Sequence, residues 1–428
     1  MLARAARIRC ARAVRCLTTS SLTATTSRLL QALDARQHHH GLPGFLYTDP
    51  QIYSAEVDVF FHNEWCFVGH DSELPAPGSY ITLQLGAHPV VVVRGADGNI
   101  RAYHNVCRHR GYTLCPKAAG KAKAGGTRLV CPYHQWSYDT NSGALLTARE
   151  MTDALDRQAL GLKPVALEQV NSYLFVSVAE QPPDFAPVRE MLSAYSEPFG
   201  LGETKVAHQS RIVEKANWKL VWENNRECYH CAATHPHLKR TFPASSSGGL
   251  PTPAERAFSE HAESLGLPSA FARADDFQYR ATRLPLVNGS QSMTMDGRPA
   301  VRGFRMGRMP EENVGDVLFY HYPSTWNHWM ADHALSFRML PLSPTETELV
   351  TTWLVPAAAR EGVDYDLATL TEVWEATNQQ DCELVEAVQR GVASPAFTPG
   401  PYSPVHEVGV IDFVEWYETV VRRRLESA

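Results

Sequence analysis

Long apolar runs are missing from this 428-residue sequence. The longest ones, such as Val90–Val93, have the length of a strand, whereas a membrane-crossing helix needs about 20 apolar residues. A basic block is also missing beyond the N-terminus, and the net charge is -6, so the sequence has no electrostatic footprint for nucleic acid. We therefore expect no membrane span and no nucleic-acid partner. Hydrophobic residues at 44% and charged residues at 20% are typical of a soluble protein.

Two further patterns are absent. No internal repeat of about 20 to 50 residues is visible, which excludes solenoids and propellers. No glycine-rich G-x-G-x-x-G fingerprint follows a predicted strand. The sequence therefore gives no sign of a dinucleotide-binding site of its own.

The first 33 residues contain no acidic residue, and the first acid of the chain is Asp34. The same segment holds six arginines and a Ser/Thr-rich run over 18–27. This composition predicts an organelle transit peptide over residues 1–33, with a basic disordered arm as the alternative. Arg15-Cys16-Leu17 followed by Thr and Ser favours a mitochondrial matrix over a chloroplast. The mature chain would then be distinctly acidic and able to dock on a basic partner.

The length suits two domains of unequal size. Short β-rich runs separated by turn signals predict an all-β domain over residues 57–180. These runs are Tyr80–Leu85, Pro89–Arg94, Thr127–Val130 and Tyr173–Val178.

The rest of the chain has a different pattern of predicted secondary structure. Apolar spacing predicts helices at Trp218–His230 and Leu367–Val392, with strands at Asp316–Tyr322 and Leu349–Val355 between them. The second domain, over residues 200–425, is therefore expected to be mixed α+β.

Two Cys/His pairs lie in the β-rich domain. Cys107-Arg108-His109 is followed after 21 intervening residues by Cys131-Pro132-Tyr133-His134. Two thiolates and two imidazoles fit a [2Fe-2S] cluster with the thiolates on one iron and the imidazoles on the other. They fit structural zinc equally well. The nine cysteines form an odd count in a long chain, which argues against a secreted disulfide framework.

Together with Pro132, Gln135-Trp136 and Gly143, these pairs closely resemble the Rieske domain family. The resemblance implies that a [2Fe-2S] cluster is held by Cys107, His109, Cys131 and His134. The separation of the pairs is longer than is usual in that family, with Lys117–Gly126 as the insertion. Cys115 is interpreted as a buried or loop cysteine outside the ligand set.

Downstream segments resemble the catalytic domain of the Rieske non-haem iron oxygenases. They are Asn217-Trp218-Lys219, Glu223-Asn224, Glu227-Cys228-Tyr229-His230 and His235-Pro236. The resemblance implies a helix-grip-like domain with a mononuclear Fe(II) held by two imidazoles and one carboxylate, which leaves positions open for O2 and substrate. The two histidines would be His230 and His235. Their five-residue separation requires the helix to end or bulge between them.

The third ligand is placed by the family pattern in a C-terminal helix, within residues 378–383, and our choice is Asp381. Asp381 and Glu383 cannot both face one ion, because residues two apart on a helix point in different directions. Glu227 lies three residues before His230 and can approach it on a helix. The resemblance implies that Glu227 links His230 to His134 of a neighbouring subunit in a homotrimer. Cys228 and Cys231 are interpreted as small packing residues.

The resemblance spans nearly all of 42–417, and Glu in place of the commoner Asp at position 227 is similar to the branch acting on quaternary amines. It implies O2-dependent N-demethylation of glycine betaine to dimethylglycine and formaldehyde, with electrons from a separate reductase or ferredoxin. The alternatives are a choline monooxygenase that makes betaine aldehyde, a non-enzymatic Rieske electron carrier and a zinc-stabilised binding module. A quaternary ammonium is best held by aromatic faces. The aromatic candidates are Phe319, Tyr320, Tyr322, Trp326 and Trp329.

Overall fold

The first part of the fold is built from short, largely buried strands. The computed structural model describes residues 19–152, 155–243 and 251–426. Val90–Val93 of β3 are fully buried, as expected for β-branched residues in the middle of a sheet. The strands up to residue 177 are β1 (Cys66–His70), β2 (Ser79–Leu85), β3 (His88–Arg94), β4 (Ile100–His104), β5 (Ala119–Lys121), β6 (Arg128–Val130), β7 (Ser137–Asp139), β8 (Leu145–Thr147), β9 (Pro164–Val170) and β10 (Tyr173–Ser177).

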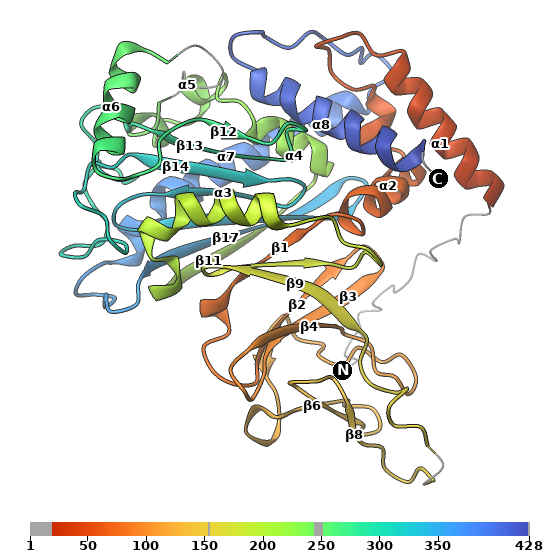
Figure 1. Ribbon diagram of the computed structural model, residues 1–428. Helices are drawn as coiled ribbons and strands as arrows, with labels where there is room; N and C mark the ends of the chain where they lie inside the picture. Colours follow the sequence, from red (N-terminus) through yellow and green to blue (C-terminus); the bar gives the residue numbers. More distant parts are fainter. Residues whose placement is uncertain (1–18, 153–154, 244–250, 427–428) are drawn as a thin grey trace, which may run out of the picture.

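These strands form two antiparallel sheets. Seven strands pair in the order β1-β10-β9-β4-β3-β2-β5, and β6, β7 and β8 form a smaller sheet. The predicted insertion contributes β5, which pairs with β2 at the edge of the larger sheet. In Figure 1 the small sheet lies at one end of the molecule, away from the helices.

The second part surrounds a seven-stranded antiparallel sheet with the order β11-β17-β16-β15-β14-β13-β12. Its strands are β11 (Thr204–Glu214), β12 (Ala272–Arg273), β13 (Tyr279–Leu284), β14 (Asp316–His321), β15 (Thr325–Trp329), β16 (Ala334–Ser343) and β17 (Glu346–Pro356). The helices are α1 (Thr19–Asp34), α2 (Pro50–Glu56), α3 (Ala186–Ser196), α4 (Trp218–Asn225), α5 (Cys231–Thr234), α6 (Pro253–Ser264), α7 (Leu367–Val392) and α8 (Val408–Leu425). The predicted combination of an all-β domain and a mixed α+β domain is confirmed.

Helix α7 has the bounds that its apolar spacing predicts. The Asp366 side chain caps its N-terminus by accepting a hydrogen bond from the backbone N–H of Thr369 over 2.9 Å. Leu370, Val373 and Trp374 are buried along one face. Because α7 packs against β11 and α4, its inner face is turned towards the chain segment that follows α4.

Helix α1 changes the interpretation of the N-terminal segment. Residues 1–18 of the predicted transit peptide lie outside the described residues. Leu29 and Leu33 of α1 are buried in the main core, and Arg28 forms an ion pair with Asp49. The predicted end at residue 33 therefore falls at the end of a packed helix. Within the described residues, no helix has the length and apolar character needed to cross a bilayer.

Candidate metal centre and pocket

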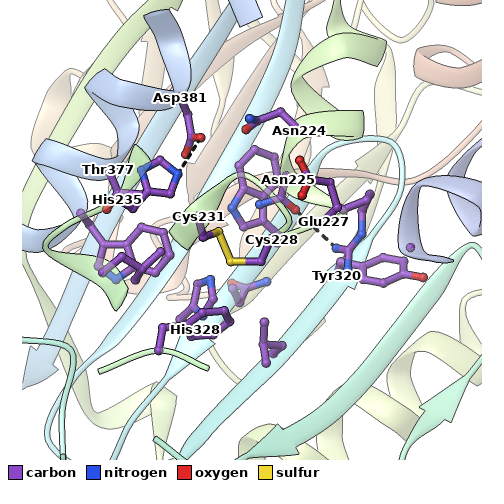
Figure 2. A pocket seen from close by; sticks show the side chains of 18 of the residues that line it. Asn224, Asn225, Glu227, Cys228, Cys231, His235, Tyr320, His328, Thr377 and Asp381 are labelled. Atoms are coloured by element: carbon purple, nitrogen blue, oxygen red, sulfur yellow. Dashed lines mark hydrogen bonds and ion pairs between the residues drawn. A yellow bond between two sulfur atoms is a disulfide. The ribbon is translucent and has the colours of Figure 1, made fainter. Parts of the chain in front are cut away.

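A cavity of about 100 Å³ lies between the segment after α4, helix α7 and strands β13–β15 (Figure 2). Its aromatic and imidazole lining residues are Phe242, Phe319, Tyr320, Trp326, Trp374, His230, His235 and His328. Among the described lining residues, the acids are Glu227 and Asp381 and the arginines are Arg226 and Arg280.

Some of the aromatic candidates line this cavity and others do not. Phe319, Tyr320 and Trp326 line the cavity, whereas Tyr322 and Trp329 have 0% exposure and belong to the core. The sequence interpretation missed Trp374. Its signal is helical spacing, because Trp374 lies seven residues before Asp381 on α7 and therefore on the same face.

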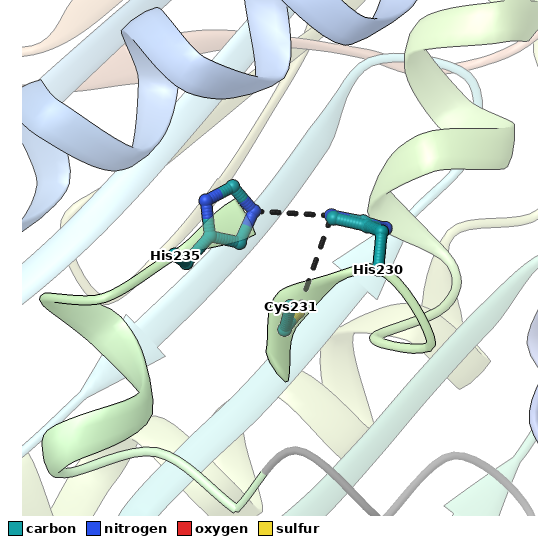
Figure 3. A group of neighbouring side chains, drawn as sticks. All are labelled: His230, Cys231 and His235. Atoms are coloured by element: carbon teal, nitrogen blue, oxygen red, sulfur yellow. Dashed lines mark hydrogen bonds between the residues drawn. The ribbon is translucent and has the colours of Figure 1, made fainter. Parts of the chain in front are cut away.

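The three side chains predicted to hold iron meet at one wall of this cavity. His230 Nε2 lies 3.1 Å from His235 Nε2. Oδ1 of Asp381 lies 3.3 Å from His230 Nε2 and 3.1 Å from His235 Nε2. Figure 3 shows the two imidazoles pointing towards each other from either side of the short helix α5.

These distances fit a shared metal ion. Two ligand atoms that each lie about 2.1 Å from one ion, at right angles, are about 3 Å apart. Without an ion or a proton between them, converging lone pairs repel one another. Asp381 Oδ1 is buried and has no hydrogen-bond donor among the described residues, as expected for a ligand atom. Two imidazoles and one carboxylate suit non-haem Fe(II).

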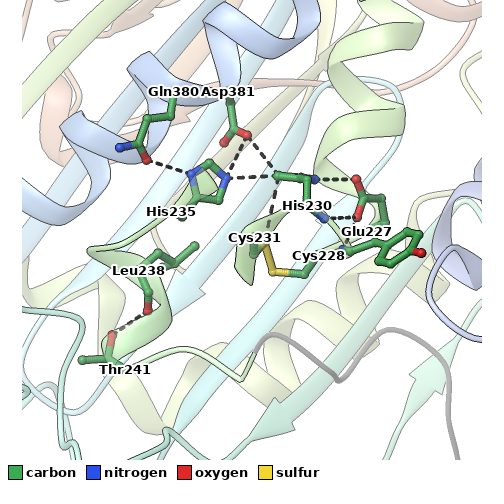
Figure 4. The surroundings of a disulfide bond; sticks show 10 residues. Glu227, Cys228, His230, Cys231, His235, Leu238, Thr241, Gln380 and Asp381 are labelled. Atoms are coloured by element: carbon green, nitrogen blue, oxygen red, sulfur yellow. Dashed lines mark hydrogen bonds and ion pairs between the residues drawn. A yellow bond between two sulfur atoms is a disulfide. The ribbon is translucent and has the colours of Figure 1, made fainter. Parts of the chain in front are cut away.

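Each imidazole is held in place through its other ring nitrogen (Figure 4). His230 Nδ1 bonds to Glu227 Oε1, and His235 Nδ1 lies 2.8 Å from Gln380 Oε1. These contacts make Nδ1 the donor and leave Nε2 as the free lone pair of both rings. The sequence interpretation missed Gln380, whose only signal is its position next to Asp381.

The backbone between the histidines differs from the prediction. Helix α4 ends at Asn225, so the predicted helix through His230 is five residues too long. The Glu227 carboxylate accepts hydrogen bonds from the backbone N–H groups of Tyr229 and His230, which turns the chain out of the helix. Glu227 therefore contacts His230 through a turn and not through helical spacing.

The electrostatics of the cluster favour positive charge. Burial alone would lower the pKa of His230, but the carboxylates of Asp381 and Glu227 outweigh it and raise that pKa to about 9. Burial alone would raise the pKa of Asp381, but the two imidazoles beside its carboxylate lower it. The two carboxylates therefore attract positive charge to the point where the three side chains meet.

Two cysteines beside the triad have a different role from the one expected. Cys228 and Cys231 form a disulfide that lines the cavity, so they are more than packing residues. Sγ of Cys231 lies 4.0 Å from His230 Nε2. The two residues between them, Tyr229 and His230, lie in a turn, and the Cα atoms of the cysteines are 4.9 Å apart, a normal disulfide separation.

The second predicted centre lies in the β-rich part, on two matching loops. Cys107 N–H bonds to Tyr112 O and Cys131 N–H bonds to Trp136 O, each over 2.8 Å. The fourth residue after each cysteine, Gly111 or Gln135, has a positive φ. Each loop thus folds back on itself and carries one cysteine and one histidine.

The four predicted ligands of this centre are brought together. Cys107 and Cys131 are buried, and the His109 and His134 rings have centroids 4.6 Å apart. His109 Nδ1 is buried without a hydrogen-bond partner among the described residues, which fits a ligand atom. Cys115 is also buried, with 4% of its surface exposed. Burial raises the pKa of its thiol to about 12, as expected for an inert cysteine outside the ligand set.

Tyr138 adds a contact that the sequence interpretation missed. Its hydroxyl lies 3.3 Å from Cys107 Sγ and accepts the backbone N–H of Arg108 over 2.9 Å. The hydroxyl proton is therefore free to be donated to the sulfur. Hydrogen bonds of this kind tune the potential of an iron-sulfur cluster.

Two family models match the chain. The Rieske [2Fe-2S] domain matches residues 64–169, and the catalytic domain of the ring hydroxylating alpha subunit matches residues 201–423. The predicted ranges 57–180 and 200–425 enclose these matches. The first match decides for an iron-sulfur cluster over zinc, and the second argues against a pure electron carrier.

Curated relatives are similar over nearly the whole chain. The glycine betaine monooxygenase oxygenase subunit of Chromohalobacter salexigens is 45% identical over 412 residues, covering 95% of this chain and 91% of the relative. The subunit of the same name from Pseudomonas aeruginosa is 43% identical and covers 90% of both chains. The predicted organelle location is wrong, because these relatives come from bacteria, which have no organelle matrix.

Solved structures share the fold. A quaternary ammonium Rieske monooxygenase, CntA, has a TM-score of 0.69 at 22% identity and covers 89% of this chain and 95% of that chain. A naphthalene 1,2-dioxygenase from Rhodococcus sp. has a TM-score of 0.67 at 18% identity, covering 95% and 99%. At these identities the likeness concerns the fold alone.

Proposed function

The chain belongs to the Rieske non-haem iron oxygenases, and from this premise we propose that it removes one N-methyl group from glycine betaine, giving dimethylglycine and formaldehyde. The observation that carries the proposal is the 45% identity to a glycine betaine monooxygenase oxygenase subunit over 95% of this chain. Choline oxidation is less well supported, because the two relatives at 43–45% identity both carry the glycine betaine name.

The cofactors of this family are a [2Fe-2S] cluster and a mononuclear iron. We infer that Cys107, His109, Cys131 and His134 hold the cluster, and that His230, His235 and Asp381 hold the iron. When bound, the cluster supplies electrons one at a time and the iron supplies positions where O2 is activated.

The cavity supports a quaternary ammonium substrate. A trimethylammonium group has no N–H to donate, so its attraction comes from aromatic faces. Trp326, Trp374 and Phe242 supply such faces in the cavity that the iron ligands also line. We infer that they hold one N-methyl group near the triad and exclude water from it.

The reaction balances with an external donor. One N-methyl C–H becomes C–OH, while the second oxygen atom of O2 leaves as water after two electrons and two protons are taken up. The resulting N-hydroxymethyl ammonium breaks its N–C bond to release formaldehyde, a proton and dimethylglycine. Because the relatives are named as oxygenase subunits, we propose that a separate reductase or ferredoxin supplies the electrons.

We also propose a homotrimer in which Glu227 contacts the partner subunit's His134. The contact between Glu227 and His230 provides one half of this link. Within one chain the two centres lie far apart. The loops that carry the Cys/His pairs adjoin β6, at the opposite end of the molecule from α4 and α5, which flank the mononuclear site (Figure 1). A second subunit is therefore needed to bring a cluster close to this glutamate.

A single turnover tests the reaction. Purified protein is reduced chemically and mixed with O2 and either glycine betaine or choline, and formaldehyde and betaine aldehyde are assayed. We expect formaldehyde from glycine betaine, close to one molecule per mononuclear iron. Betaine aldehyde from choline, without formaldehyde from glycine betaine, would replace the proposal by the choline alternative.

A further inference from the structure

Two arginines line the cavity without an acidic partner. Arg280 forms no ion pair with a described residue, and its guanidinium lies over aromatic rings. Among the described residues, the Arg226 guanidinium donates a hydrogen bond only to the amide oxygen of Asn225, at 3.4 Å, and its Nε is buried without a partner. Uncompensated guanidinium groups in a half-buried pocket are costly unless an anion binds there.

Both guanidinium groups gather around one aromatic ring. Arg226 Cζ lies 4.1 Å and Arg280 Cζ lies 5.8 Å from the centre of the Tyr320 ring. The strands explain this placement, because Arg280 of β13 pairs directly with Tyr320 of β14 and their side chains share one face of the sheet. Burial, and then the nearby charge of Arg226, lower the pKa of Arg280. An anion between the two arginines would relieve both effects.

The acids around them are already engaged. Glu227 is bonded to His230, and Asp381 lies against both histidines of the triad. Asp412, which acts on Arg280 electrostatically, forms an ion pair with Arg273 at 2.8 Å. Among the described residues, none of these carboxylates forms an ion pair with Arg226 or Arg280. The missing anion is therefore expected to come from the ligand.

We propose that Arg226 and Arg280 form a carboxylate subsite that orients the substrate and selects betaines over quaternary amines without a carboxylate. This inference rests on the proposed function. In Figure 2 Tyr320 lies across the cavity from His235 and Asp381. A carboxylate held beside Tyr320 places the trimethylammonium end towards the triad. Guanidinium groups suit this role because they bind carboxylates in a planar, two-pronged geometry.

Equilibrium binding tests the subsite independently of turnover. The iron-loaded holoenzyme is titrated calorimetrically with glycine betaine and with its amide, which keeps the trimethylammonium group and replaces the carboxylate by a neutral carboxamide. The variants are Arg226→Gln, Arg280→Gln and the charge-conserving Arg280→Lys. The matched control is Arg308→Gln, a change of an exposed arginine paired with Glu197 on the surface.

We expect the wild type to bind glycine betaine more tightly than the amide. Each Gln variant should lose about tenfold to a hundredfold in affinity for glycine betaine, with little change for the amide, as for the loss of a charge-assisted hydrogen bond. Arg280→Lys should recover part of the loss, and Arg308→Gln should match the wild type. An unchanged cluster spectrum and iron content would show that the variants are folded.

Two outcomes would overturn the subsite. One is equal affinity of the wild type for glycine betaine and its amide. The other is an equal loss of affinity for both ligands in the Gln variants, which would indicate a role in packing around Tyr320. The turnover assay separates this from the reaction itself. If formaldehyde is released but the protein binds glycine betaine and its amide equally well, the proposed function is supported and the subsite is not. Selective binding of glycine betaine without formaldehyde would leave the subsite standing without the function.

Discussion

Gln380 accepts a hydrogen bond from His235 Nδ1 over 2.8 Å, one residue before the carboxylate that completes the proposed triad. The bond fixes the tautomer of His235 and aims its Nε2 at His230 and Asp381. One turn of α7 thus supplies both a ligand and the residue that orients another ligand.

Gln380→Leu should therefore weaken iron binding at the mononuclear site. We expect about a tenfold to hundredfold lower affinity, because losing the orienting bond leaves the ring free to rotate. Iron retained after dialysis against graded chelator concentrations measures this. The control is Gln379→Leu, since Gln379 is exposed and bonds to Glu383. Equal iron retention in the wild type and Gln380→Leu would show that Gln380 does not contribute to iron binding.

Asp381→Ala should abolish turnover while leaving the cluster intact. The iron content should fall from about three to about two atoms per chain, since the two remaining atoms belong to the [2Fe-2S] cluster. Metal analysis and the visible spectrum report the two centres separately. Glu383→Ala, two residues away on the same helix, should retain both the third iron and activity. Retained activity in Asp381→Ala would show that another group is the third ligand.

Tyr138→Phe should lower the reduction potential of the cluster. The Tyr138 hydroxyl is placed to donate to Cys107 Sγ, and losing that bond disfavours the more negative reduced state. The expected shift is on the order of tens of millivolts. A redox titration followed by electron paramagnetic resonance measures it. Tyr133→Phe is the control, because Tyr133 is 51% exposed on the neighbouring loop. An upward shift, or none, would assign the hydroxyl proton elsewhere.

Glu223 should make stability depend on pH. Burial raises its pKa to about 7, although hydrogen bonding from Tyr47 at 2.7 Å opposes the shift. Between about pH 4.5 and pH 7 the folded chain holds a proton that the unfolded chain has released. The stabilisation is therefore complete below this window and is lost as the pH rises through it.

Glu223→Gln mimics the protonated carboxyl and should remove this dependence. From pH 5 to pH 8, the free energy of unfolding of the wild type should fall relative to the variant by about 1–3 kcal/mol. Urea denaturation of both proteins across this range measures the difference. Glu203→Gln, at an exposed position, should follow the wild type. A difference that does not change with pH would place the pKa of Glu223 in its usual range.

Local patterns determined much of this protein. The two Cys/His pairs lie in short loops, and His230 and His235 flank a single turn of helix. The spacing of these residues along the chain therefore largely determines how they lie relative to one another. The span of α7 also follows from its own apolar repeat and its Asp366 cap. Such features need only neighbours in the sequence.

Tertiary structure decided the rest, because those contacts join distant segments. The end of α4 at Asn225 depends on a glutamate that bonds back to the following backbone, and the burial of α1 depends on partners far along the chain. The pairing of β13 with β14 sets Arg280 beside Tyr320, and packing of α7 brings Gln380 to His235. Sequence spacing carries no record of these contacts, since strand register and helix packing are set by the burial of whole faces. The sequence thus determined which metal chemistry the chain supports, and the fold decided which charges surround the substrate.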